Sequence, residues 1–369
     1  MARNTIKLAL VFGTRPQIIK CVPVIRECVK RKIDLTLINT GQHYDFELSK
    51  IFFQGLHIPR IKYNLGVGSG SHGWQTGKIM IGVEKILYEL KSSACLVPGD
   101  TNSAVASALA AIKLKIPVIH LESGLRSFDE FMPEEINRKV IDHVSQLLFA
   151  PTRNAEKNLH NEGIPKAKIE LSGDTMYDLY LLEKERIAAV QLPNGAEPHQ
   201  YVVLTLHREE NTENPKVLMK ILAAVKQFAL PVVFPIHPRT KNRLQQFNLF
   251  DTAKEIKNLI LINPLDYHSM MKLMQKSLFV MTDSGGMQKE AFMVGVPCIT
   301  LRHNTEWMET VKMGANVLVD RLTRNEILDA MRDTMKDREQ IIKTITKAKN
   351  PFGTGRAAVK VVKEMVNRF

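Results

Sequence analysis

The chain has 369 residues, enough for two domains, and its hydrophobic content of 44% and charged content of 24% are typical of a globular protein. Lysine and arginine number 51 against 38 aspartate and glutamate residues, so the formal net charge is +13. These basic residues are spread through helix-like segments such as 26–32 and 336–349, without a run of five like charges or interleaved aromatic residues. This distribution argues against a nucleic-acid site and favours a basic surface that attracts small phosphorylated ligands.

The four cysteines do not form a C-x-x-C pair, and each lies in an apolar context, so we expect buried free thiols rather than a disulfide or metal site. They are Cys21, Cys28, Cys95 and Cys298. The first apolar run, Leu8–Phe12, is too short for a signal peptide, and no stretch approaches the roughly 18 apolar residues that span a bilayer. We expect a cytoplasmic protein that binds neither a membrane nor a metal ion.

Short apolar runs alternate with helical patterns in the first half of the chain. Strands are predicted at Leu8–Phe12, Leu35–Ile38, Ala94–Val97 and Val118–Leu121, and helices at Pro16–Arg31 and Ser103–Leu114. Alternating strands and helices predict a parallel sheet covered on both faces.

The alternation weakens in the polar segment Glu183–His199, which contains the turn signal Pro193-Asn194-Gly195 and is interpreted as a linker. It then resumes with a helix at Pro215–Phe228 and strands at Tyr201–Leu206, Val232–Ile236, Leu259–Ile262, Leu278–Met281 and Cys298–Leu301. Two doubly wound, Rossmann-like α/β domains facing a cleft are therefore predicted, the first over residues 1–182 and the second over 200–352.

The turn after the first strand, Gly13-Thr14-Arg15-Pro16, leads into a helix whose backbone N–H groups could bind an anion. Arg15 and Lys20 are about one turn apart, so both could reach one phosphate. The alternative is an ordinary strand–helix turn with basic residues on the surface.

Three carboxylates follow strands or begin a helix in the first half. Asp100 follows a strand, although it could simply cap the next helix. Glu122 lies at the tip of a buried strand, where an unpaired carboxylate is costly. Glu134, in Pro133-Glu134-Glu135, could be no more than a favourable helix start. If the three meet near one cleft, their pKa values are pushed apart, which suits acid–base catalysis.

The second half contains two histidines at strand ends and a glycine turn. His207 and His237 each follow a strand, although a buried structural histidine would fit the pattern as well. Asp283-Ser284-Gly285-Gly286 joins a strand to a helix and could hold a phosphate through backbone N–H groups. Glu290, further along that helix, could accept ribose hydroxyls.

Taken together, these motifs resemble the non-hydrolysing UDP-N-acetylglucosamine 2-epimerase family, which has the glycosyltransferase-B type of fold. The resemblance extends from Leu8 to about Arg356, with the motifs in the family's order. They are Gly-Thr-Arg-Pro, Gly-Asp-Thr, Glu-x-Gly-Leu-Arg-Ser, Pro-Glu-Glu-x-Asn-Arg, His-Arg-x-Glu-Asn, Asp-Ser-Gly-Gly-x-Gln and the C-terminal Asn-Pro-Phe-Gly. The fold implies that residues 353–369, with a last helix at Ala357–Arg368, cross back onto the N-terminal domain.

The resemblance implies reversible inversion at carbon 2 of a UDP-sugar, interconverting UDP-GlcNAc and UDP-ManNAc through elimination of UDP and re-addition to 2-acetamidoglucal. It implies no cofactor, a homodimer, and UDP and the two UDP-sugars as ligands. The carbon 2 proton is not acidic, so the reaction needs a carboxylate base, a group that returns the proton, and cations on the departing pyrophosphate.

The resemblance also assigns roles to residues. Asp100, Glu122 and Glu134 match acid–base carboxylates, without a decision between base and acid, and His207 matches an active-site histidine. The substrate-binding set is Arg15, Lys20, Arg138, His237, Ser284, Gly285, Gly286 and Glu290, of which Arg15, Lys20 and the Ser-Gly-Gly turn match diphosphate contacts and Glu290 a ribose contact.

The chain departs from the family pattern at several positions. Gln17 and Lys289 replace glutamates, and Trp307-Met308 replaces Arg-Pro. Gln17, the stretch 69–73 and the Glu306-Trp307 pair also resemble relatives that act on UDP-2,3-diacetamido-glucuronic acid.

A regulatory site for a second UDP-GlcNAc is present in some bacterial members. Gln42 and His43 match it, whereas Asp45 and Ser69–Trp74 do not. A hydrolysing epimerase that releases ManNAc and UDP, a glycosyltransferase and a non-catalytic nucleotide-sugar binder are the other interpretations.

Overall fold

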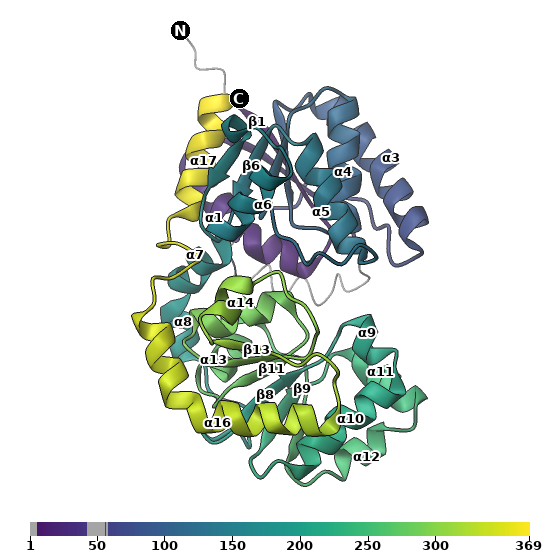
Figure 1. The fold of residues 1–369 in the computed structure, drawn as a ribbon. Helices are drawn as coiled ribbons and strands as arrows, with labels where there is room; N and C mark the ends of the chain where they lie inside the picture. Colours follow the sequence, from purple (N-terminus) through teal and green to yellow (C-terminus); the bar gives the residue numbers. More distant parts are fainter. Residues whose placement is uncertain (1–5, 43–55, 57) are drawn as a thin grey trace. The chain divides into compact units, whose positions relative to one another are not determined.

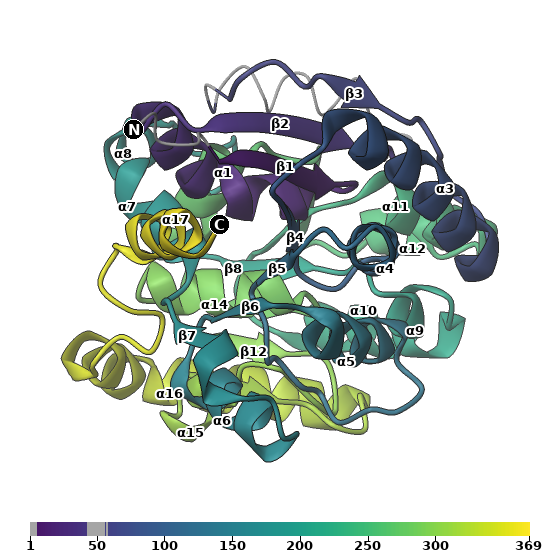
Figure 2. The same cartoon turned by 90° about the horizontal axis from the view of Figure 1, so that it is seen from above.

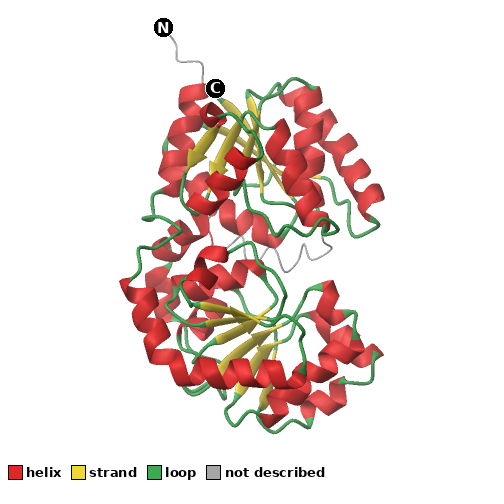
Figure 3. Ribbon diagram, viewed as in Figure 1, coloured by secondary structure: helices red, strands yellow, loops and turns green. Residues whose placement is uncertain are grey.

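The computed structural model describes residues 6–42, 56 and 58–369, and the chain forms two compact units (Figure 1). The first unit comprises Met1–Leu182 together with Asn350–Phe369, and the second comprises Glu183–Lys349. Each unit has its own parallel sheet, with strands flanked by helices (Figure 3). The α/β class predicted from the strand–helix alternation is thereby confirmed.

The sheet of the first unit has seven strands, and each neighbouring pair is parallel. The strands are β1 (Lys7–Phe12), β2 (Asp34–Asn39), β3 (Tyr63–Asn64), β4 (Ala94–Pro98), β5 (Val118–Leu121), β6 (Leu147–Ala150) and β7 (Ile169–Leu171). Their order is β3-β2-β1-β4-β5-β6-β7. The direction of winding reverses between β1 and β4, as it does at the switch point of a doubly wound sheet.

Both faces of this sheet are covered by helices. They are α1 (Arg15–Lys30), α3 (His72–Leu90), α4 (Asn102–Lys113), α5 (Pro133–Val144), α6 (Arg153–Asn161), α7 (Thr175–Leu182) and α17 (Ala357–Arg368), and a 3-10 turn spans Lys166–Lys168. In β1, Leu8, Leu10 and Phe12 pack with α1 and α17, whereas Ala9 and Val11 pack with α3 and α4. Figure 2 shows these two pairs of helices on opposite sides of the strands. A strand that is apolar at nearly every position is therefore buried on both faces.

The last helix, α17, belongs to the first unit although it follows the second unit in the chain. Val361, Val362 and Met365 join the core that α1 forms with the sheet, and the yellow helix lies beside α1 in Figure 1. Asp178 of α7 accepts hydrogen bonds from the backbone N–H groups of Ala357 and Ala358, at 3.1 and 2.8 Å. These bonds satisfy two N–H groups that the first turn of a helix otherwise leaves without partners.

The second unit repeats the architecture with six parallel strands. The strands are β8 (Val202–Thr205), β9 (Val232–Pro235), β10 (Leu259–Ile262), β11 (Val280–Thr282), β12 (Cys298–Thr300) and β13 (Asn316–Leu318), in the order β10-β9-β8-β11-β12-β13. The helices are α8 (Lys184–Ala189), α9 (Glu209–Thr212), α10 (Pro215–Gln227), α11 (Pro238–Gln246), α12 (Phe250–Lys254), α13 (Tyr267–Gln275), α14 (Gly285–Met293), α15 (Met308–Lys312) and α16 (Arg324–Lys347). The switch point here lies between β8 and β11.

The predicted strands and helices agree with the observed ones to within one or two residues at most ends. The segment predicted as a linker, Glu183–His199, is different, because it contains α8 and belongs to the second unit. Ile187 supplies the reason: its side chain is almost fully buried, so this turn of helix is packed rather than exposed. Among the described helices, none is long and apolar enough to cross a bilayer.

All four cysteines are free and buried, as the sequence predicts. Burial raises the pKa of the Cys28, Cys95 and Cys298 thiols to about 12. Burial also raises the pKa of the Cys21 thiol. The thiols are therefore neutral packing groups.

We expect the change Asp178→Ala to lower the free energy of unfolding by about 1–3 kcal/mol, because two buried N–H groups of α17 lose their acceptor. Amide hydrogen exchange at Ala357 and Ala358 should become faster. Asp178→Asn is the matched control, since its amide oxygen still accepts one of the two bonds. Unchanged exchange in the alanine variant would show that the cap does not hold the helix.

Candidate active site

The switch point of the first unit gathers three polar loops. Gly13 follows β1, the Gly99-Asp100 turn follows β4, and Glu122 follows β5. Because β1, β4 and β5 are adjacent and parallel, their carboxyl ends lie at the same edge of the sheet. This is the position at which open α/β sheets bind ligands.

Glu122 is held by a lysine from α1. The ammonium group of Lys20 donates a hydrogen bond to Glu122 Oε2, and both side chains are only slightly exposed, at 13% and 11%. The backbone of Glu122 has φ +68°, a left-handed conformation that costs a side-chain-bearing residue about 1–2 kcal/mol. A carboxylate that is partly buried, paired with a cation and carried on strained backbone is typical of a functional site.

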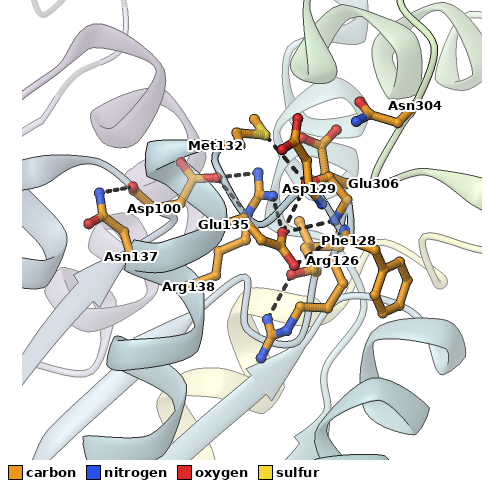
Figure 4. Close-up of polar contacts among 12 residues, drawn as sticks. Asp100, Arg126, Phe128, Asp129, Met132, Glu135, Asn137, Arg138, Asn304 and Glu306 are labelled. Atoms are coloured by element: carbon orange, nitrogen blue, oxygen red, sulfur yellow. Dashed lines mark hydrogen bonds and ion pairs between the residues drawn. The ribbon is translucent and has the colours of Figure 1, made fainter.

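Asp100 is held by an arginine from α5. Asp100 Oδ2 accepts from Arg138 Nε at 2.9 Å and from Arg138 NH2 at 2.6 Å, while the Asp100 side chain stays 25% exposed. The side-chain amide of Asn137 donates to the backbone carbonyl of Asp100 at 2.8 Å. Figure 4 shows the Arg138 guanidinium between the carboxylates of Asp100 and Glu135. Asp100 therefore has a fixed direction and retains access to a ligand.

Glu135, rather than Glu134, is the buried carboxylate of α5. Its side chain has no exposure and bonds Arg138 NH1 at 3.1 Å and the backbone N–H of Ser127 at 2.9 Å. Glu134 is half-buried, and no hydrogen bond or ion pair joins it to another residue in the part of the chain that the structure describes. The predicted catalytic role of Glu134 stays a prediction, and Glu135 is a structural residue that the sequence analysis missed.

A signal for Glu135 existed in the helix periodicity. Positions 135, 138 and 142 lie on one face of α5 at spacings of three and four residues, together with the apolar Ile141. Charged residues on the core-facing stripe of an amphipathic helix indicate buried ion pairs.

At the start of α1, where an anion site is predicted, a side chain bonds the preceding turn. Gln17 Oε1 accepts from the backbone N–H groups of Gly13 and Thr14, at 2.8 and 3.2 Å. The amide nitrogen of Gln17 donates to the carbonyl of Pro98 at 2.7 Å, which ties this turn to β4. These two N–H groups are thus occupied, and the anion site at the helix N-terminus stays a prediction. Arg15, the first residue of α1, is half-buried.

Of the residues compared with a second nucleotide site, only some lie in the part of the chain that the structure describes. The side chain of Gln42 is buried, and its oxygen accepts from the N–H and the hydroxyl of Ser103 at 2.9 and 2.6 Å. His43 and Asp45 lie outside the described residues.

In the second unit, the switch point is organised by Asp283. This fully buried carboxylate follows β11 and accepts from the backbone N–H groups of His207 and Arg208 and from the side-chain amide of Asn211, all at 3.1 Å. It also lies 3.3 Å from His207 Nδ1, while the imidazole is 42% exposed. Asp283 therefore orients the predicted active-site histidine, a role that the sequence analysis did not assign to it.

The Ser-Gly-Gly turn begins α14 next to this loop. Ser284 caps the helix, and its hydroxyl accepts from the N–H of Met287 at 3.4 Å. A methyl group added at Gly285 would lie 3.3 Å from Glu306 Oε2 and 3.7 Å from the indole nitrogen of Trp307. The turn thus has little spare room on that side, and a helix N-terminus of this kind suits an anion.

Two cations accompany Glu306 at this turn. Arg302 NH1 lies 3.3 Å from Glu306 Oε2, and Arg208 NH2 lies 3.8 Å from Glu306 Oε1. The Lys289 ammonium, from a side chain only 1% exposed, lies 4.6 Å from the ring centre of Trp307. The two departures from the family pattern at positions 289 and 307 are therefore in contact with each other.

The remaining predicted binding residues of this unit also follow the strand ends. His237 comes after β9, caps α11 and is exposed, and its Nδ1 accepts from the N–H of Arg239 at 3.2 Å. Glu290 is buried in α14, one turn and a half beyond Ser284. The ligand contacts assigned to Arg15, Lys20, Arg138 and these residues stay predictions.

Two parallel sheets with helices on both sides, and polar clusters at the strand ends, define a protein of the glycosyltransferase-B type. A family model described as UDP-N-acetylglucosamine 2-epimerase matches residues 26–366, and the chain belongs to this family.

Relatives of known name match almost the entire chain. The UDP-N-acetylglucosamine 2-epimerase of Methanocaldococcus jannaschii is 44% identical over 366 residues, covering 97% of this chain and 98% of that protein. Its crystal structure in complex with UDP-GlcNAc and UDP is similar, with a TM-score of 0.91 at 43% identity, covering 98% of this chain and all of the other. The UDP-2,3-diacetamido-2,3-dideoxy-D-glucuronate 2-epimerase of Pseudomonas aeruginosa is 41% identical and covers 96% of this chain and 98% of that protein.

We expect the change Asp283→Asn to lower the free energy of unfolding of the second unit by about 1.5–3 kcal/mol. The NH2 group of asparagine replaces one of the two carboxylate oxygens, so it faces N–H donors without accepting from them. The chain has two tryptophans, Trp74 and Trp307, so in a Trp74→Phe background the fluorescence of Trp307 reports urea unfolding beside this loop. Asp251→Asn, an exposed aspartate on α12, is the control and should change stability by less than about 0.5 kcal/mol. Equal stability of the two variants would show that Asp283 does not stabilise the loop at His207 and Arg208.

Proposed function

We propose that the protein catalyses the reversible epimerisation of UDP-GlcNAc to UDP-ManNAc at carbon 2 of the sugar, without a cofactor. The observation that carries the proposal is the pair of partly buried carboxylates Asp100 and Glu122, each held by its own cation at adjoining strand ends. Membership in the UDP-N-acetylglucosamine 2-epimerase family supports the same reaction.

The chemistry proceeds by elimination and re-addition. A carboxylate takes the proton from carbon 2 while the bond from carbon 1 to the UDP oxygen breaks, and the electron pair of the carbon–hydrogen bond forms the double bond of 2-acetamidoglucal. The proton then returns to carbon 2 from the opposite face, and UDP adds again at carbon 1. Two proton-transfer groups on opposite faces are needed, and each must be an acid in one direction and a base in the other.

Asp100 and Glu122 are suited to these two roles. The carboxylate of Asp100 is paired with Arg138, and that of Glu122 is paired with Lys20. The same two cations supply positive charge beside the reacting sugar, where negative charge develops as the carbon–hydrogen bond breaks. Glu134 is the third acid–base candidate. Which carboxylate faces which side of the sugar is left open.

The second unit supplies the UDP contacts in this proposal. The N–H groups of Gly285 and Gly286 and the hydroxyl of Ser284 would hold the diphosphate, Glu290 the ribose, and His207 would stabilise the leaving phosphate. Arg15, Arg138 and His237 complete the substrate contacts. The homodimer and the cytoplasmic location are part of the same proposal.

A second substrate is favoured by one relative. The Pseudomonas aeruginosa enzyme named for UDP-2,3-diacetamido-2,3-dideoxy-D-glucuronate is 41% identical to this chain. Trp307, which contacts Lys289, belongs to the Glu306-Trp307 pair that resembles those relatives. The same elimination at carbon 2 would apply, because the uronic acid differs at carbons 3 and 6 and not at the reacting centre.

Incubation with UDP-GlcNAc in heavy water tests the reaction. We expect UDP-ManNAc with deuterium at carbon 2 and UDP still attached, because the group that protonates carbon 2 from the opposite face carries a deuteron from the solvent. NMR of the product measures both features. Free ManNAc with UDP would indicate a hydrolysing enzyme, and an unchanged carbon 2 would contradict epimerisation. A parallel incubation with UDP-2,3-diacetamido-glucuronic acid compares kcat/KM for the two sugars.

We expect Asp100→Asn and Glu122→Gln each to lower kcat by about 100-fold or more while UDP affinity stays within about threefold, because each removes proton transfer and not the UDP contacts. Steady-state kinetics and calorimetric titration with UDP measure the two quantities. Glu84→Gln, at an exposed position of α3, is the matched control with a carboxylate-to-amide change. Full activity of Asp100→Asn or of Glu122→Gln would show that the substituted residue is not catalytic.

A further inference from the structure

His120 is a fully buried histidine of β5 whose two ring nitrogens both face acceptors. Nδ1 lies 2.6 Å from Asp142 Oδ1, and Nε2 lies 2.9 Å from the backbone carbonyl oxygen of Gly99. A carbonyl oxygen can only accept, so Nε2 must carry a proton.

Asp142 lies against the other ring nitrogen and is itself held from two sides. Its second oxygen accepts from the backbone N–H of Gly124 at 3.1 Å and lies 2.8 Å from Arg126 NH2. Burial opposes ionisation of Asp142, but the neighbouring His120 and Arg126 outweigh it and hold the pKa of this carboxyl below its ordinary value. The carboxyl group therefore fixes the ring of His120 from the side opposite Gly99.

Arg126 connects this carboxyl group to a second one. It bonds Glu162 through Nε and NH2, both at 2.6 Å. Buried charges are tolerated when they are paired and hydrogen-bonded in this way.

The acceptor on the other side of the ring is the turn that carries Asp100. The N–H of Gly99 donates to the carbonyl of Leu121 at 2.9 Å, so both polar groups of Gly99 are held by β5. Gly99 has φ +65°, and a methyl group added there would lie 3.1 Å from Lys20 Nζ and 3.5 Å from Glu122 Oε2. The glycine thus brings the backbone of the turn against the Lys20–Glu122 pair, with Asp100 as the next residue.

We propose that His120 is a positioning residue of the acid–base site: its Nε2–H group clamps the Gly99 carbonyl and thereby fixes Asp100 relative to Glu122. The kinetic consequence rests on the proposed function, whereas the clamp does not. A displacement of about 1 Å in a reacting group costs about 100-fold in rate, so a rigid turn has a direct catalytic value.

Two substitutions separate the two hydrogen bonds of the ring. The amide nitrogen of glutamine reaches the place of Nε2, so His120→Gln keeps a donor for Gly99 and loses the one for Asp142. The amide nitrogen of asparagine reaches the place of Nδ1, so His120→Asn keeps the donor for Asp142 and leaves the Gly99 carbonyl without one. Both variants lose the imidazole ring, which makes each the control for the other.

We expect kcat of His120→Gln to stay within about tenfold of the wild type and that of His120→Asn to fall by about 100-fold or more, with KM and UDP affinity within about threefold in both. Thermal unfolding of each variant is measured alongside. If His120 were merely structural, both variants would lose stability and have the same kcat per folded molecule. Equal kcat values, or a more active asparagine variant, would overturn the proposal.

NMR of protein labelled with 15N in histidine tests the hydrogen bond from Nε2 without any substrate. We expect a directly bonded N–H signal at Nε2 of His120 that is protected from exchange with solvent, and a ring without a proton on Nε2 would overturn the clamp. Amide hydrogen exchange at Gly99 should be faster in His120→Asn than in His120→Gln. These two measurements decide the clamp even if the wild-type protein does not epimerise a UDP-sugar, so failure of this proposal and failure of the proposed function are distinguishable.

Discussion

The carboxyl ends of adjacent parallel strands lie at one edge of a sheet, and the rest of the candidate site depends on this constraint. In the first unit, the switch point between β1 and β4 brings the turns after residues 12 and 98 together, and β5 adds Glu122 beside them. In the second unit, the switch point between β8 and β11 does the same for His207 and Asp283. The polar residues are thus gathered by backbone topology before any side chain is considered.

Charges gathered in this way must be compensated, and the first unit uses a separate partner for each carboxylate. Lys20 comes from α1 to Glu122, and Arg138 comes from α5 to Asp100. Arg138 is itself held by the buried Glu135, so its position does not depend on a ligand. Fixed charges of this kind need little reorganisation when charge moves during a reaction, which is how preorganised sites lower a barrier.

The sequence could predict the strands, the loops that follow them and the carboxylates on those loops, because apolar runs and turn residues are local signals. It also carried a signal for the burial of Glu135, because this residue shares a helix face with Arg138 and Asp142, whereas Glu134 lies on another face. The use of Gln17 as an acceptor for Gly13 and Thr14 was hidden, because it requires the side chain to turn back onto the loop. His120 and Asp142 come from different elements and meet only through the pairing of β5 with its neighbours and the packing of α5.

At the Ser-Gly-Gly turn of the second unit, a buried cation rather than a buried carboxylate must be compensated. This cation lies close to the N-terminus of α14. Lys289 is the fifth residue of α14, where the helix dipole disfavours positive charge. The face of Trp307 offsets this, since a desolvated cation–π contact contributes about 2 kcal/mol. The contact therefore lowers the cost of keeping a charged side chain buried beside the Ser-Gly-Gly turn, where Arg208 and Arg302 also lie beside Glu306.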